Sequence, residues 1–134
     1  MEEKETYTLK DLTEIVSDLR GERGCPWDQK QTHESLISCM EEECQEAVDA
    51  IRNQDMENLQ EELGDVLLQV VMHAQIAAEE GVFSIHEVID GICRKMIRRH
   101  PHVFGNAVFS GEEELKKNWR EIKEMEKQER NHEE

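Results

Sequence analysis

The stretch EEECQEAVDAIRNQDMENLQEELGD, residues 41–65, decides the fold. On both sides of the short polar link Asn53-Gln54-Asp55, apolar residues recur three or four positions apart, which is the period of an amphipathic helix. A connection this short favours antiparallel neighbours. The sequence therefore predicts a helical hairpin, with one helix over about 32–52 and the other over about 56–80.

The same helical spacing continues in both directions from the hairpin, and no segment alternates as a strand does. It predicts three more helices, over about 9–20, from 84 to just before Pro101, and from 110 onward. Gly and Pro interrupt the pattern, so we expect a turn over 24–28 and a loop over 100–110.

Side chains that can cap helices stand at the expected starts. Thr8 precedes the first helix, and Ser84-x-x-Glu87 and Ser110-x-x-Glu113 have the capping-box pattern. We therefore expect an all-α fold, an antiparallel bundle of about five helices in a single domain over residues 1–134. The almost wholly charged end from about 124 is expected to fray or be disordered.

The apolar stripes of the hairpin set the expected core. The hairpin helix over about 32–52 should bury Leu36, Ile37, Met40, Cys44, Ala47, Val48 and Ile51. The hairpin helix over about 56–80 should bury Leu59, Leu63, Val66, Leu67, Val70, Val71 and Ala74. A bundle made from 134 residues is thin. Since a second copy would bury the apolar edges left over, we expect a homodimer or higher homo-oligomer.

The net charge of the chain limits the partners that the protein can be expected to bind. Lys and Arg number 16 and Asp and Glu number 32, for a formal net charge of −16. Nucleic acids and anionic membranes require a basic surface, so neither is an expected partner. The sequence has no apolar run of about 20 residues and no signal-peptide pattern near its start, so a cytoplasmic protein is expected.

Two acidic clusters lie in the hairpin, Glu42-Glu43-x-x-Glu46 and Glu62-x-x-Asp65. At about 100° per residue, Glu43, Glu46, Glu62 and Asp65 fall at the border of the buried faces, whereas Glu41 and Glu61 fall on the exposed side. Like charges at this spacing repel one another, and Mg²⁺ or Mn²⁺ bound by carboxylate oxygens would compensate them. The alternative is a solvated acidic face, which is common in so acidic a chain.

One concentrated basic patch stands near the end of the fourth predicted helix. Lys95 and Arg99 share a face there, with Arg98 and His100 close by. Such groups can bind a triphosphate, but they can equally compensate the negative end of a helix dipole. Each of the two tryptophans, Trp27 and Trp119, can stack on a base or serve as a packing anchor.

Five motifs, taken together, make the chain resemble the MazG family of nucleoside triphosphate pyrophosphohydrolases, within the all-α NTP pyrophosphatase group. The resemblance covers roughly Leu19 to Glu126. The motifs are Cys25-Pro-Trp-Asp28 with Gln31-Thr32, Glu42-Glu43-x-x-Glu46, Glu62-Leu-Gly-Asp65, Arg98-Arg-His-Pro-His-Val-Phe104, and Asn118-Trp119 before Glu121-Ile-Lys123.

The resemblance implies Mg²⁺-dependent hydrolysis of an NTP or dNTP to the monophosphate and pyrophosphate, with Mn²⁺ as a possible substitute ion. It assigns roles to nine residues. It implies metal ligation by Glu43, Glu46, Glu62 and Asp65, activation of the attacking water by Glu42, and nucleotide binding by Lys95, Arg99 and Trp119, with Cys39 beside the same site.

Some members of this family carry two tandem copies, and the forms of the first and fourth motifs here are similar to the first copy. Two other functions stay open. One is a narrower dUTP or dCTP pyrophosphatase, or a relative acting on phosphoribosyl-ATP. The other is a non-catalytic helical module for dimerisation or nucleotide sensing.

Overall fold

The computed structural model describes residues 3–133, and their regular structure is entirely helical, as predicted. In chain order the elements are α1 (Leu9–Arg20), α2 (Pro26–Lys30), the 3₁₀ turn η1 (Glu34–Leu36), α3 (Ile37–Arg52), α4 (Met56–Glu79), α5 (Ile85–Arg99), α6 (Pro101–Phe104) and α7 (Glu112–Glu133). The chain divides into two compact units, residues 1–88 and 89–134, and each is described by itself. Within the described residues, no helix combines the length and apolar character needed to cross a membrane.

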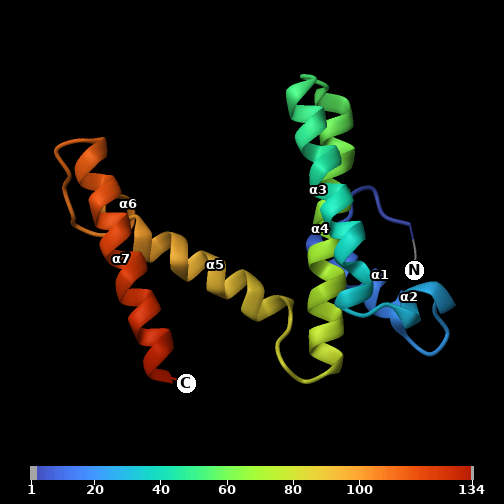
Figure 1. The fold of residues 1–134 in the computed structure, drawn as a ribbon. Coiled ribbons are helices and arrows are strands. Elements are labelled where there is room, and N and C mark those ends of the chain that lie inside the picture. The colour runs from blue at the N-terminus through green and yellow to red at the C-terminus, as the bar shows by residue number, and fades with distance from the viewer. Residues whose placement is uncertain (1–2, 134) are drawn as a thin grey trace. The chain divides into compact units, whose positions relative to one another are not determined.

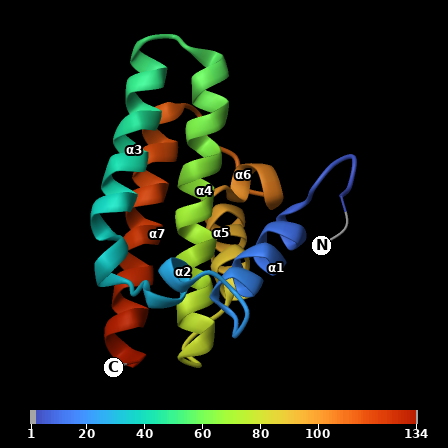
Figure 2. The same cartoon turned by 90° about the vertical axis from the view of Figure 1, so that its right-hand side faces the viewer.

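The predicted hairpin of α3 and α4 is the main feature of the first unit. Figures 1 and 2 show the two helices side by side and antiparallel. The link between them contains Gln54 at a φ of 55° and Asp55, whose side chain accepts from the backbone N–H of Asn58 and so caps α4. At its other end, α4 stops before Gly81, whose φ of 73° suits a residue without a side chain.

A small apolar core lies where α1, η1 and α4 meet. Val16, Leu36, Val71, Met72 and Ile76 are buried there, and Leu12, Cys39, Leu68 and Ile85 pack against them. Burying an aliphatic side chain of this size fully contributes roughly 1.5–3 kcal/mol. This core therefore fixes one end of the hairpin to α1.

The turn predicted over 24–28 contains a short helix, α2. Pro26 occupies its first turn, where the missing N–H costs nothing. The guanidinium of Arg20 donates to the carbonyl oxygens of Asp28 at 2.6 Å and Gln31 at 2.9 Å, and also pairs with Glu79 on α4. The segment is held by these long-range contacts, which local spacing does not reveal.

The predicted caps are present, with one change of partner. Thr8 and Asp11 form a capping box at α1, and the backbone N–H of Ser84 donates to Glu87 at 2.9 Å. Ser110, however, donates from its backbone N–H to Glu114, and not to Glu113. Helix α7 accordingly begins at Glu112, slightly later than predicted.

The second unit contains α6, inside the segment predicted as a loop, and the long helix α7. The charged segment from 124 to 133, expected to fray or be disordered, is helical. It is rich in Glu, Lys, Gln and Arg, which are good helix formers. Glu126 also pairs with Arg98 and Arg99.

Part of the predicted core of the hairpin is exposed instead. Ile37, Ile51 and Leu63 each have about half of their surface exposed, at 54%, 56% and 53%, while Leu36, Ala47 and Val71 are buried as expected. Met40, Cys44, Val48 and Leu67 are exposed too. The reason is that the core and α1 cover only one side of the hairpin near its Leu36 end.

Candidate functional site

The four carboxylates predicted to bind metal converge in the middle of the hairpin. Each of Glu43, Glu46, Glu62 and Asp65 has an oxygen within 4.8 Å of the corresponding atoms of the other three. The i, i+3 spacing places each pair on one face of its helix, and the antiparallel hairpin turns the two pairs toward each other. Glu41 and Glu61 are exposed, as predicted, but Glu46 is exposed too, whereas Glu43, Glu62 and Asp65 are half-buried.

Crowding raises the pKa of two of these carboxyl groups, those of Glu62 and Glu43. A hydrogen bond shared with Glu46, together with burial, raises the pKa of Glu62 to about 7. Burial raises the pKa of Glu43, and the charges of Asp65 and Glu46 add to the effect. The arrangement therefore favours a proton or another cation in the cluster.

Two oxygens of the cluster have no hydrogen-bond partner although they are buried, one on Glu43 and one on Glu62. Buried carboxylate oxygens usually accept hydrogen bonds or ligate a metal. Opposite oxygens around one Mg²⁺ are about 4.2 Å apart. The four oxygens all lie within 4.8 Å of one another, so small shifts would bring them around one hard divalent cation.

Glu42 and Cys39, predicted to act beside this cluster, differ in their surroundings. The side chain of Glu42 is exposed and lies outside the group of four, and its charge contributes to raising the pKa of Glu43. Cys39 is half-buried one turn before Glu43 and packs against the apolar core. Its observed contacts are thus those of a packing residue.

The other predicted substrate residues, Lys95, Arg99 and Trp119, come together in the second unit. The indole N–H of Trp119 donates to the backbone carbonyl of Arg99, and its ring meets His100 edge to face at 5.5 Å. Lys95 and Arg99 line one pocket, while Arg99, Trp119 and Lys123 line a smaller one beside it. Trp119 therefore fixes the end of α5 that carries the basic groups.

The larger of these two pockets contains charged residues that the sequence analysis did not select. It measures about 360 Å³ and is lined by Lys95, Arg98, Arg99, Glu126, Glu129 and Arg130. The three additional α7 residues, Glu126, Glu129 and Arg130, lie in the end that was expected to be disordered. Their spacing of three or four residues was the available signal, since it places them on one helical face.

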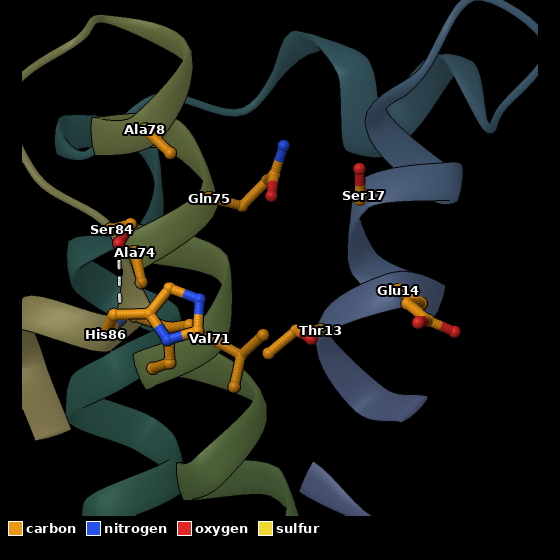
Figure 3. A pocket seen from close by; sticks show the side chains of 10 residues that line it. Thr13, Glu14, Ser17, Val71, Ala74, Gln75, Ala78, Ser84 and His86 are labelled. Carbon is orange, nitrogen blue, oxygen red and sulfur yellow. Dashed lines mark hydrogen bonds between the residues drawn. The ribbon is translucent and has the colours of Figure 1, made fainter. Parts of the chain in front are cut away.

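A different pocket, of about 260 Å³, lies between α1, α4 and the start of α5. Figure 3 shows Gln75 extending toward the helix that carries Ser17, whereas Glu14 turns away from the pocket. Its floor is formed by small apolar residues such as Val71 and Ala74. None of the nine predicted site residues lines this pocket.

The chain is similar to known proteins over most of its length. Residues 31–104 match the family model described as the MazG nucleotide pyrophosphohydrolase domain. The chain is 51% identical to the uncharacterized protein YabN of Bacillus subtilis over 94% of its own length and 26% of that protein. It is 50% identical to the nucleoside triphosphate pyrophosphohydrolase/pyrophosphatase MazG of Thermotoga maritima, over 89% of its own length and 45% of that protein.

A solved structure has a similar fold. The crystal structure of a mazG-related protein from Thermotoga maritima matches with a TM-score of 0.71 and 30% identity, over 87% of this chain and 99% of that one. By contrast, the chain spans between about a quarter and a half of the two curated relatives, at 26% and 45% of their lengths.

Proposed function

Because the chain belongs to the family of MazG nucleotide pyrophosphohydrolase domains, we propose that it hydrolyses nucleoside triphosphates in a Mg²⁺-dependent reaction. In the proposed reaction, water attacks the α-phosphorus, the α–β phosphoanhydride bond breaks, and the products are a nucleoside monophosphate and pyrophosphate. Ribo- and deoxyribonucleotides are both included.

One observation carries this proposal, namely the four convergent carboxylates of α3 and α4. They lie within 4.8 Å of one another, and buried oxygens of Glu43 and Glu62 lack partners. A solvated acidic face would leave its carboxylates apart and hydrated, so the convergence of the four groups and the two buried oxygens without partners favour a cation ligand set. Mn²⁺ prefers similar ligands and is a plausible substitute ion.

Each residue has a proposed part in the reaction. Glu43, Glu46, Glu62 and Asp65 would hold Mg²⁺, which when bound neutralises phosphate charge and polarises the phosphoryl oxygens. Glu42, exposed beside Glu43, would orient or deprotonate the attacking water. Lys95, Arg99, Trp119 and Cys39 would contact the nucleotide.

A pyrophosphate-release assay across the eight common ribo- and deoxyribonucleoside triphosphates tests this function. Release should require Mg²⁺ and stop in EDTA. Release that continued unchanged in EDTA would contradict the proposal. A strong preference for one pyrimidine deoxynucleotide would point to the narrower pyrophosphatase, and calorimetric binding without any turnover would point to a sensing module.

We also propose that two copies associate through the exposed apolar stripe of the hairpin. Ile37, Ile51 and Leu63 are more than half exposed there, which is unusual for side chains of this size on adjoining helices. Sedimentation equilibrium should give the mass of a dimer or larger assembly, and Ile51→Glu should lower it. A monomer at micromolar concentration would contradict this assembly.

A further inference from the structure

We propose that the contact between His33 and His73 is sensitive to pH. It holds the segment before α3 against α4 at neutral pH and opens when both imidazole rings are protonated. The pair lies in the first unit, at the end of the hairpin away from the link between α3 and α4. Neither residue belongs to the candidate site, so this inference goes beyond the proposed function and does not depend on it.

The geometry of the two rings is the first argument. Their Nδ1 atoms are 2.8 Å apart, which is a hydrogen-bond distance, and the ring planes are nearly parallel, at 5° to each other. A hydrogen bond between two ring nitrogens requires one nitrogen to carry a proton and the other to be bare. A pair with at most one positive charge meets this requirement. Two imidazolium rings do not, because both Nδ1 atoms then carry protons and the like charges repel.

The surroundings of the rings indicate which nitrogen is the donor. Nε2 of His73 is buried without a hydrogen-bond partner. Because a buried N–H group without an acceptor is costly, the proton of neutral His73 belongs on Nδ1, which donates to His33. His33 then carries its own proton on Nε2, and this atom lies 3.9 Å from a carboxylate oxygen of Glu80.

Protonation of the second ring is opposed by the fold. Burial lowers the pKa of His73 below its ordinary value of 6.5, and the charge of His33 lowers it further. The folded protein therefore favours neutral His73 more strongly than the unfolded chain does. Its contribution to stability is present above pH 6.5 and is lost as the pH falls through the folded-state pKa. The contact should accordingly open on the acidic side of 6.5.

The charges around the pair favour one proton on His33 over two on the pair. Glu80 on α4 is the carboxylate beside His33, and its negative charge stabilises a proton there. Other charged or titratable side chains of the neighbouring elements are paired, exposed or packed against the apolar core: Arg20 with Glu79, Glu34, and Cys39.

The contact acts on a short segment between two other anchors. Gln31, before it, accepts a hydrogen bond from Arg20 through its backbone carbonyl, and Leu36, after it, is buried in the apolar core. His33 directly precedes η1, and α3 starts directly after η1. Residues 32–35 are therefore the part that acid should free from α4. They lead into the helix that carries the carboxylates of Glu43 and Glu46.

Exchange of backbone amide protons, followed by mass spectrometry on the full chain, tests the contact. It is measured at about pH 7.5 and about pH 5 and corrected for the intrinsic effect of pH on exchange. Acid should reduce the protection of residues 32–36 about tenfold, as expected for loss of one hydrogen bond. Residues 47–51, at the other end of the hairpin, should not lose protection. EDTA is present throughout, so that no metal ion bridges the two imidazoles.

Three variants separate this contact from general effects of acid. His33→Gln can still accept from Nδ1 of His73 but gains no charge, so protection should stay high at both pH values. His33→Ala cannot accept, so protection should be low at both. His86→Gln removes an exposed histidine of the same unit and should behave like the unmodified protein. Circular dichroism at each pH verifies that the helices are intact.

The proposal fails if the unmodified protein has equal corrected protection at both pH values, or if His33→Gln keeps the original pH dependence. NMR of the ring nitrogens needs no variant. It should find a proton on Nδ1 of neutral His73. Two neutral rings that both carry their protons on Nε2 would overturn the proposal, because no proton would lie between the Nδ1 atoms. None of these measurements requires turnover, so a failure of the proposed function is distinguished from a failure of this inference.

Discussion

Glu62 on α4 and Glu126 on α7 are both partly buried glutamates, yet the pKa values of their carboxyl groups are shifted in opposite directions. The neighbours of Glu62 are carboxylates, and the hydrogen bond shared with Glu46, with burial, raises its pKa to about 7. Burial alone would also raise the pKa of Glu126, but hydrogen bonds from Arg99 and Arg98 outweigh it and lower that pKa. The surroundings, and not the residue type, therefore decide the charge state.

The difference separates two uses of glutamate in one acidic chain. In the hairpin, the carboxylates are incompletely paired and favour the arrival of a cation. In the second unit, Glu126 is a counter-ion that orders two arginines, and the pocket around it keeps a positive excess. The first region therefore has crowded, unpaired carboxylates, whereas the second has a carboxylate paired with arginines.

The largest effect should come from neutralising one carboxylate of the hairpin. Glu62→Gln or Asp65→Asn should lower Mg²⁺-dependent pyrophosphate release by about 100-fold or more, because each removes a proposed ligand. Steady-state assays at saturating Mg²⁺ would measure the loss. Glu61→Gln, a neighbouring exposed position, is the matched control and should keep normal turnover. Equal losses in both variants would remove the distinction between the two faces of α4.

The pH dependence of stability should show the next effect. The pKa of Glu62 is about 7 in the folded protein against an ordinary value of 4.5, so the folded state binds this proton more tightly than the unfolded chain does. The contribution of this group to stability is complete below pH 4.5 and is lost as the pH rises through 7. In EDTA, the urea midpoint should therefore fall over this range.

Added Mg²⁺ should reverse that fall, because the ion and the proton compete for the same oxygens. The rise in melting temperature on adding Mg²⁺ should be larger at pH 8 than at pH 5. Glu62→Gln should flatten the slope measured in EDTA and raise the midpoint at pH 8. A slope unchanged by this substitution would mean that other groups cause the pH dependence.

A smaller effect of opposite sign is expected at Glu126. Its lowered pKa gives stability that is present above pH 4.5 and is lost as the pH falls through the folded-state value. Glu126→Gln should therefore destabilise the protein at pH 7, by roughly 1 kcal/mol, the upper end for a surface ion pair. The difference from the unmodified protein should shrink in acid. Urea unfolding would measure it, and Glu124→Gln, exposed on the same helix, should have little effect.

Helical periodicity was enough to predict the long helices and the convergence of the four carboxylates, while the metal they would bind stays a prediction. The hairpin could be predicted because Asn53-Gln54-Asp55 leaves little choice of direction, and the cluster because a spacing of three fixes each carboxylate pair on one face. Helix α2 could not be predicted in this way, because it is held by hydrogen bonds from Arg20. Arg20 lies outside α2 and also pairs with Glu79 on α4.

The exposed stripe and the basic pocket were harder for a related reason. Periodicity shows that Ile51 and Leu63 are on an apolar stripe, but not which element covers that stripe. Arg130 belongs to a charged segment without an apolar pattern, and its spacing from Glu126 places both on one helical face without showing that α5 lies opposite that face. In both cases the missing information is a contact between residues far apart in the sequence.

The buried guanidinium of Arg20 connects three separate stretches of chain, since it bonds from α1 to the end of α2 and to Glu79 near the end of α4. Helix ends normally fray one by one, and their amide protons exchange with solvent independently. Here the opening of any one end leaves hydrogen-bond donors or acceptors of the others unpaired. The last turns of α1, α2 and α4 should consequently exchange their amide protons in one shared opening event, slower than that of ordinary helix ends.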